Sequence, residues 1–257
     1  MSVEFIRNVF LVEERIANTN EYPFTIPAVR ALDGLSFSQV TYFVGENGSG
    51  KSTILEAIAV ALGFNAEGGT KNFKFSTRDS TSSLSRSIRF VRGPYRPLTE
   101  FFLRAESFFN LATQIEELDK VPAYAPPIID SYGGRSLHEQ SHGESFQALL
   151  KNRFGPRGLY ILDEPEAALS PSRQLWLLSR MHELVLDESQ FIIATHSPIV
   201  LAYPGATIYE VGKDGISRVE YDDTEQVSLT RDFLAQRKRY VERLFAYVEK
   251  GTTPEGQ

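Results

Sequence analysis

The sequence has 257 residues, of which 42% are hydrophobic and 23% are charged, a composition typical of a globular protein with a sizeable buried core. Its formal net charge of −6 argues against a surface that generally coats nucleic acid, and the absence of cysteine excludes disulfides and thiolate chemistry. The first residues carry acids without a long apolar segment, and no run approaches the ~18 apolar residues of a membrane span. We therefore expect a cytoplasmic protein.

The predicted elements of the first half lead into one strand–turn–helix unit. Residues 3–12 are predicted to form a strand, and after a polar loop and short strands at Leu35 and Phe37 comes the apolar run 40–44. The sequence then reads GENGSGKS, and apolar residues at helical spacing follow as far as Leu62. A strand, a glycine-rich turn and a helix are thus predicted in succession.

This glycine-rich turn has the pattern of a phosphate-binding loop. Its glycines let successive backbone N–H groups converge on one point, where the helix N-terminus adds partial positive charge. Lys51 is placed to reach the β- and γ-phosphates of a nucleotide, Ser52 to ligand Mg²⁺, and Thr53 to make a secondary phosphate contact. An incidental lysine in a structural turn is the alternative. The predicted nucleotide-binding residues are Gly45, Glu46, Asn47, Gly48, Ser49, Gly50, Lys51, Ser52 and Thr53.

Two aromatic residues precede this loop on a proline-flanked segment. Either Tyr22 or Phe24 could stack on adenine, because every base offers a flat π-face. The alternative is that both anchor the segment on the core. Tyr22 is the residue that we assign to nucleotide binding.

The middle of the chain is predicted to hold a β arm and helices. Residues 71–92 read as two strand-like runs around a Ser/Thr-rich turn, most simply a hairpin, and a further strand is expected at 100–104. A helix with Phe108, Leu111, Ile115 and Leu118 on its apolar face follows. After the Pro- and Gly-rich segment 121–134, which must be a loop, another helix starts near Gly143 or Glu144.

The second half alternates strands with helices. Buried-type strands are expected at 158–166 and 191–198, with a helix over 171–187 between them whose inner face includes Leu175. A hairpin turning at 213–215 and one amphipathic helix over 232–250 complete the chain. This alternation predicts an α/β fold with a mainly parallel sheet.

Polar residues end two of these strands. In open parallel sheets ligands bind at the carboxyl ends of strands, so Asp163 is placed to hold Mg²⁺ and Glu164 to polarise the attacking water as general base. An ordinary strand-to-loop transition would also contain such acids. His196 follows the strand expected at 191–198, where it could contact the γ-phosphate or the attacking water. A lone histidine, however, is more often structural.

Four motifs in this order carry a resemblance to a known family. GENGSGKS, QSHGES at 140–145, YILDEPEAALS and ATHS together resemble the ABC-type ATPase domain over essentially the whole chain. The segments FFLRAESF and YGGRSLHEQSHGESF are similar to small stand-alone predicted ATPases of this class, related to the SMC and RecF-like group more than to transporter subunits. The resemblance implies a P-loop NTPase fold in a single domain.

The resemblance also implies how that domain is divided. A core lobe over about 1–65 and 155–257, an antiparallel β arm over about 66–105 and a helical signature lobe over about 106–154 are expected. In the family two protomers enclose two ATP molecules, so the signature residues Ser141, His142, Gly143 and Glu144 are expected to act in trans. The same residues also fit a capping box at a helix start, and the two interpretations are compatible.

Three positions depart from the family pattern. His142 stands where glycine is usual, and Ser170 stands where the loop after the paired acids usually has aspartate. No clear counterpart of the family's glutamine follows the strand that ends at Arg104, and Glu106 is the nearest residue that could contact metal or water.

Three functions remain open at this stage. The first is Mg²⁺-dependent ATP hydrolysis in an ATP-sandwiched homodimer, with Lys51, Glu164 and His196 as catalytic residues. The second is a nucleotide-gated switch that binds DNA or a protein partner and hydrolyses ATP slowly, and the third is the ATPase subunit of a membrane transporter. Possible DNA contacts near the last helix are Arg231, Arg237, Lys238, Arg239 and Arg243.

Overall fold

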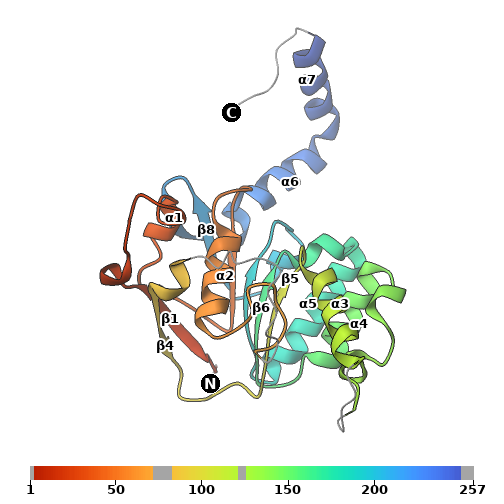
Figure 1. Cartoon of the computed structure of the whole chain (residues 1–257). Coiled ribbons are helices and arrows are strands. Elements are labelled where there is room, and N and C mark those ends of the chain that lie inside the picture. The colour runs from red at the N-terminus through yellow and green to blue at the C-terminus, as the bar shows by residue number, and fades with distance from the viewer. Residues whose placement is uncertain (1–2, 72–82, 121–125, 250–257) are drawn as a thin grey trace.

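A computed structural model describes residues 3–71, 83–120 and 126–249 (Figure 1). Its centre is a six-stranded sheet in which five strands are parallel and the last is antiparallel to its neighbour. In spatial order the strands are β5 (Thr99–Arg104), β6 (Gly158–Asp163), β7 (Gln190–Ala194), β3 (Val40–Val44), β8 (Thr207–Gly212) and β9 (Gly215–Val219). The mainly parallel sheet predicted from the sequence is confirmed.

A second, antiparallel sheet has the order β2-β1-β4, formed by Leu35–Ser36, Ile6–Leu11 and Ile88–Arg92. The boundaries predicted for the β arm, 66–105, are wrong at both ends. β1 belongs to this antiparallel sheet although it precedes residue 66, and β5 joins the main sheet as its edge strand. The first run of the expected hairpin lies mostly outside the described residues.

Seven α-helices are described. They are α1 (Pro27–Arg30), α2 (Lys51–Ala61), α3 (Phe108–Asp119), α4 (His142–Arg153), α5 (Pro171–Leu186), α6 (Glu225–Ala235) and α7 (Arg237–Glu249). Within the described ranges, none of these helices has the length and apolar character to cross a bilayer. Figure 1 shows α3, α4 and α5 grouped on one side of the molecule, away from α1 and the antiparallel sheet.

The core is split by the main sheet, because alternate residues of a strand face opposite sides. Tyr42 and Leu162 pack in a cluster with residues of α3, α4 and α5. Phe43 and Ile161 pack in a second cluster with α2, α1 and the antiparallel sheet. Both faces are therefore covered, and the central strands β3, β6 and β7 are buried along their whole length, as is usual for parallel sheets.

The predicted positions of the helices agree with the structure better than the predicted buried faces do. Leu118 and Leu175, which we expected to face inward, are 45% and 59% exposed. The single helix predicted over 232–250 is two helices, because Gln236 takes a non-helical backbone conformation between α6 and α7. Leu234 and Phe245 are 70% and 63% exposed, and Figure 1 shows α7 projecting from the body of the molecule.

Candidate active site

The candidate site lies where the parallel strands end. β6, β7 and β3 are neighbours in that order, and β5 lies beside β6. Their carboxyl ends bring Asp163 and Glu164, His196, the phosphate loop and Arg104 to one edge of the sheet. Residues far apart in the sequence are thus placed in one row.

The phosphate loop is shaped by its glycines and closed by Lys51. Gly50 has a φ of 104°, and a Cβ on Gly45 would stand 2.1 Å from the carbonyl oxygen of Val211 on β8. Lys51 is buried and its Nζ donates to the carbonyl oxygens of Gly45 at 2.9 Å and Glu46 at 2.8 Å. Burial lowers the pKa of Lys51, whereas the nearby carboxylates raise it. A desolvated ammonium group held on loop carbonyls is well suited to bind phosphate oxygens instead.

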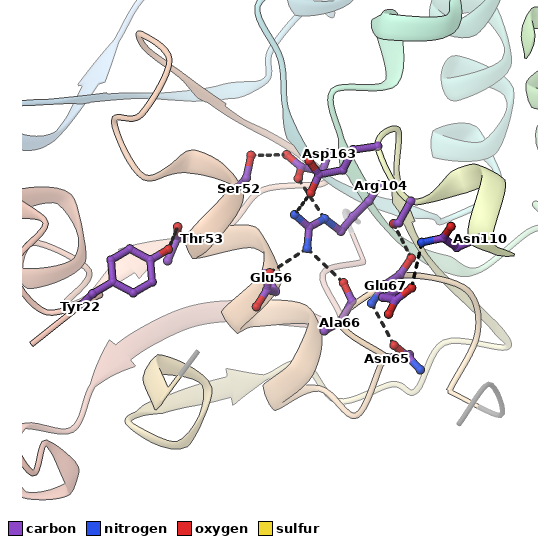
Figure 2. Close-up of polar contacts among 12 residues, drawn as sticks. Tyr22, Ser52, Thr53, Glu56, Asn65, Ala66, Glu67, Arg104, Asn110 and Asp163 are labelled. Carbon is purple, nitrogen blue, oxygen red and sulfur yellow. Dashed lines mark hydrogen bonds and ion pairs between the residues drawn. The ribbon is translucent and has the colours of Figure 1, made fainter. Parts of the chain in front are cut away.

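Ser52 and Asp163 form an oxygen pair next to the loop. The Ser52 Oγ donates to Asp163 Oδ1 at 3.0 Å (Figure 2). Asp163 is only 5% exposed, and burial raises the pKa of this carboxyl to about 6 against the opposing effects of Arg104 and Ser52. One carboxylate and one hydroxyl are hard donors that leave other positions to phosphate and water oxygens, which is the donor set that Mg²⁺ prefers. The residues therefore fit a magnesium ion.

Glu164 and His196 face each other from adjacent strand ends. Glu164 has a left-handed φ of 52°, a conformation that costs a non-glycine residue about 1–2 kcal/mol. Its backbone N donates to the carbonyl oxygen of Ala194 at 2.9 Å, and its Oε1 lies 3.5 Å from His196 Nε2. The Glu164 side chain is 42% exposed, so water can reach it.

Arg104 lies at this edge of the sheet, although the sequence analysis gave it no role. Its Nε lies 3.6 Å from Asp163 Oδ2, and its Nη1 donates to Glu56 Oε2 of α2 at 2.7 Å (Figure 2). Its Nη2 binds Glu106, whose side chain is 73% exposed. The residue proposed to replace the missing glutamine is therefore paired with Arg104. No sequence motif marks Arg104, and only the pairing of β5 with β6 could have shown its place.

Glu166 and Gln174 are two further residues that the sequence analysis gave no role. Glu166 Oε1 accepts from the backbone N of His196 at 2.6 Å. Gln174 accepts from the Ser197 hydroxyl at 2.6 Å and donates to the carbonyl oxygen of Leu169 at 3.0 Å. These bonds connect the loop after β6 with the loop after β7, and so hold His196 beside Glu164.

The two aromatic candidates upstream of the loop differ. The Tyr22 side chain is 67% exposed and its hydroxyl lies 3.0 Å from Thr53 Oγ1, whereas Phe24 is buried in the core. Tyr22 also lines a cavity of about 240 Å³ with Lys51, Ser52 and Glu164. The ring of Tyr22 is thus free to meet a base, and Phe24 is a core anchor.

A larger cavity of about 880 Å³ lies along Glu46–Ser49, and its lining includes Glu210 and Asp214. Neither Lys51 nor Ser52 lines this larger cavity. The smaller cavity, which holds Lys51 and Ser52, is therefore the better phosphate site despite its size.

The signature residues lie apart from the loop. Ser141 caps α4: its Oγ accepts from the Glu144 backbone N at 3.4 Å, and the Glu144 carboxylate accepts from the Ser141 backbone N at 2.9 Å. Gly143 packs so closely that a Cβ there would stand 1.9 Å from Nη1 of Arg173. Within the described residues, no hydrogen bond, ion pair or cavity lining joins 141–144 to the phosphate loop.

Several buried polar atoms at the strand ends have no hydrogen-bond partner. Ser49 Oγ, His196 Nε2 and Glu166 Oε2 are among the atoms of this kind in the described part of the chain. A buried polar group without a partner is costly, so a cluster of such groups indicates a place where a ligand supplies the missing bonds. The strand order, the loop and this cluster define a P-loop nucleoside triphosphatase.

Comparisons with known proteins narrow this class. A family model described as "AAA domain" matches residues 27–120. A predicted ABC transporter ATP-binding protein of Caldanaerobacter subterraneus subsp. tengcongensis is 28% identical over 203 residues, which cover 67% of this chain and 77% of that protein. Together with the four motifs, these matches support an ABC-type ATPase domain.

Solved structures are similar as well. An ATP-binding cassette of an ABC transporter is 19% identical with a TM-score of 0.49, over 89% of this chain and 99% of that one. The SMC head domain from Thermotoga maritima is 19% identical with a TM-score of 0.37, over 72% and 92% of the two chains. The strand order and motifs, rather than these matches, define the fold of this protein.

Proposed function

We propose that the protein binds ATP with Mg²⁺ and hydrolyses it between two copies of the chain. The observation that carries this proposal is the row of strand ends, where Glu164 lies 3.5 Å from His196 and Ser52 lies 3.0 Å from Asp163. One pair has the groups needed to activate water, and the other has the oxygen donors of a magnesium site. Lys51, at the start of the helix that follows β3, supplies the positive charge for the phosphates.

In this proposal Glu164 is the general base. Its carboxylate accepts a proton from water as the water oxygen attacks the γ-phosphorus, and the bond to the ADP oxygen breaks. His196 hydrogen-bonds the γ-phosphate or the water through Nε2, and Glu166 fixes the His196 backbone. Ser52 and Asp163 would hold Mg²⁺, which would neutralise charge on the phosphate oxygens. Lys51 exchanges its loop carbonyls for the β- and γ-phosphate oxygens.

The second copy is proposed because one chain holds only part of the site. Ser141 and the start of α4 belong to the helical side of the molecule and make no described contact with the phosphate loop. A hydroxyl and free N–H groups at a helix start are an anion site of their own. In a symmetric dimer, each α4 start would close over the γ-phosphate bound by the partner, which explains why two copies are needed.

The test compares Glu164→Gln with the unchanged protein. Turnover with Mg²⁺ and ATP is expected to fall by about 10²–10⁴-fold, the usual contribution of a general base, while ATP affinity stays within a few-fold. Glu14→Gln is the control, because Glu14 is exposed on the short helix at 13–15 and lies outside the described site. Unchanged turnover in Glu164→Gln would remove this residue from the mechanism.

A nucleotide-gated binding module is the second candidate. The exposed residues Arg237, Lys238 and Arg239 begin α7, which projects from the body of the molecule. Binding of duplex DNA that strengthens with ATP and weakens with salt would favour this function. A titration without signal at low salt would argue against it.

A transporter subunit is the third candidate. It is supported by the description of the Caldanaerobacter relative as an ABC transporter ATP-binding protein. Copurification with a membrane-embedded partner would favour this function. A cytoplasmic location and the SMC- and RecF-like relationship stay predictions.

A further inference from the structure

Arg104 lies directly opposite Asp163. The parallel pairing of β5 with β6 makes these two residues register partners at the last position of each strand. The guanidinium group lies near Oδ2 of this candidate metal ligand, whereas Ser52 contacts Oδ1. Figure 2 shows it between Asp163 and Glu56, with Ser52 on the other side of Asp163.

The contacts of Arg104 join three parts of the molecule. Asp163 ends β6, Glu56 lies on the helix that follows the phosphate loop, and Glu106 lies in the turn that leads to α3. The Arg104 side chain is only 15% exposed, and those of Glu56 and Asp163 are 16% and 6% exposed. The largely buried guanidinium group of Arg104 thus faces three carboxylates. It also donates to the carbonyl oxygen of Ala66 at 3.2 Å.

These contacts divide the two oxygens of Asp163. Oδ1 accepts the Ser52 hydroxyl at 3.0 Å, and Oδ2 lies 3.6 Å from Arg104 Nε. The hydrogen bond at Oδ1 and the guanidinium charge near Oδ2 act on the two ends of the carboxylate, and together they favour the orientation in which Oδ1 faces Ser52. The same guanidinium binds Glu106 and so holds that exposed carboxylate on the far side of Arg104.

We propose that Arg104 is a positioning residue for the magnesium site, which orients Asp163 toward the bound Mg²⁺ and keeps Glu106 at the edge of the site. This inference rests on the proposed function. Outer partners that orient a metal ligand commonly affect metal affinity by ~10–100-fold although they never touch the ion. A planar guanidinium with five donors can bind several carboxylates at once, which the ammonium of lysine does less well.

The charge of the guanidinium group has a second effect on Mg²⁺, which opposes the first. A fixed cation near a metal site repels Mg²⁺, so removal of Arg104 could tighten metal binding if repulsion outweighed orientation. Three carboxylates surround the guanidinium, and their combined charge exceeds its own. Orientation is therefore the stronger effect in this account, and the sign of the change decides between the two.

The experiment measures equilibrium binding of a fluorescent ATP analogue with Mg²⁺ and with EDTA. The Mg²⁺-dependent gain in affinity is expected to fall ~10-fold or more in Arg104→Gln, with binding in EDTA changed less than about twofold. Arg104→Lys keeps the charge and should recover part of the gain. Arg92→Gln is the matched control, because Arg92 is exposed on β4.

Glu56→Gln is a second test variant in case Arg104→Gln does not fold. It removes one partner of Arg104 but leaves Arg104 and Asp163 in place, and thermal unfolding of each variant reports whether it folds. If Arg104→Gln does not fold, the Mg²⁺-dependent gain in affinity is measured in Arg104→Lys and Glu56→Gln instead. A reduced gain in these variants supports the inference, and an unchanged gain in both overturns it. An unchanged or larger gain in folded Arg104→Gln would overturn it too. If the unchanged protein bound no ATP, the proposed function itself would fail.

Discussion

The phosphate-loop side and the signature side of this protein are built in contrasting ways. On the loop side, Lys51 and Asp163 are buried and their partners come from the ends of adjacent strands. On the signature side, Ser141 is exposed and forms its hydrogen bonds within the N-terminal cap of α4. The sheet fixes the side chains on the loop side, whereas the signature side presents only the N-terminus of α4. In the proposed function, the loop side therefore binds nucleotide within a single chain, and catalysis needs the signature side of a second copy.

Lys51→Ala should disrupt ATP binding at the phosphate loop and give the largest of the expected effects. Hydrogen bonds to charged groups contribute about 1.5–3 kcal/mol, so loss of the lysine contacts with phosphate should weaken ATP binding ~100-fold or more. Equilibrium binding of labelled ATP measures this, with Lys151→Ala on α4 as the control for a lost surface charge. Binding within threefold of the unchanged protein would show that the loop does not hold the triphosphate.

Ser141→Ala should break the signature side alone. Turnover is expected to fall ~100-fold, as when one transition-state donor is lost, while ATP binding measured at low protein concentration is unchanged. Removing the cap should also cost ~1 kcal/mol of stability, which thermal unfolding can measure. Ser141→Thr keeps both the cap and the hydroxyl and should retain most of the turnover. Near-normal turnover in Ser141→Ala would leave the residue with capping as its only role.

How well each side could be predicted follows from where its information lies. Gly45–Ser52, Asp163, Glu164 and His196 each end an apolar run, so local pattern and the strand-end rule place them together. Arg104 has no local signal, because its role depends on β5 pairing with β6. The face of an amphipathic helix was the least predictable feature, since Leu234 and Phe245 have the spacing of core residues yet are exposed. Periodicity shows that a face is apolar without showing what covers it.

The pH dependence of Mg²⁺ binding should sharpen the account of the loop side. Burial raises the pKa of Asp163 to about 6, so the carboxylate is charged above that pH and protonated below it. Because a metal ligand must be deprotonated, Mg²⁺ affinity should fall ~tenfold per unit as pH decreases below about 6. Asp163→Asn should abolish this step, and a step with its midpoint near pH 4 would contradict the buried environment of the carboxyl.

The same group should affect stability in the opposite direction. Its folded-state pKa lies above the value in the unfolded chain, so the protonated form is the one that folding favours. In metal-free protein, stability contributed by Asp163 should be present at low pH and lost as the pH rises from about 4 through about 6. Thermal unfolding of the unchanged protein and of Asp163→Asn across this range checks the sign.

Tyr22 should give the smallest effect. Stacking on a base contributes ~1–3 kcal/mol, so Tyr22→Ala should weaken ATP binding ~5–10-fold or more. Tyr22→Phe keeps the ring and loses only the hydroxyl contact with Thr53, and its affinity should stay within about twofold. If the two variants bound ATP equally well, the tyrosine ring would have no part in adenine recognition.

Size-exclusion chromatography of Glu164→Gln tests the central claim most directly, because slow hydrolysis should trap the state in which both sides meet. The account predicts monomers without nucleotide and with ADP, and a dimer with Mg²⁺ and ATP that Ser141→Ala prevents. A monomer that holds ATP under all these conditions would contradict it.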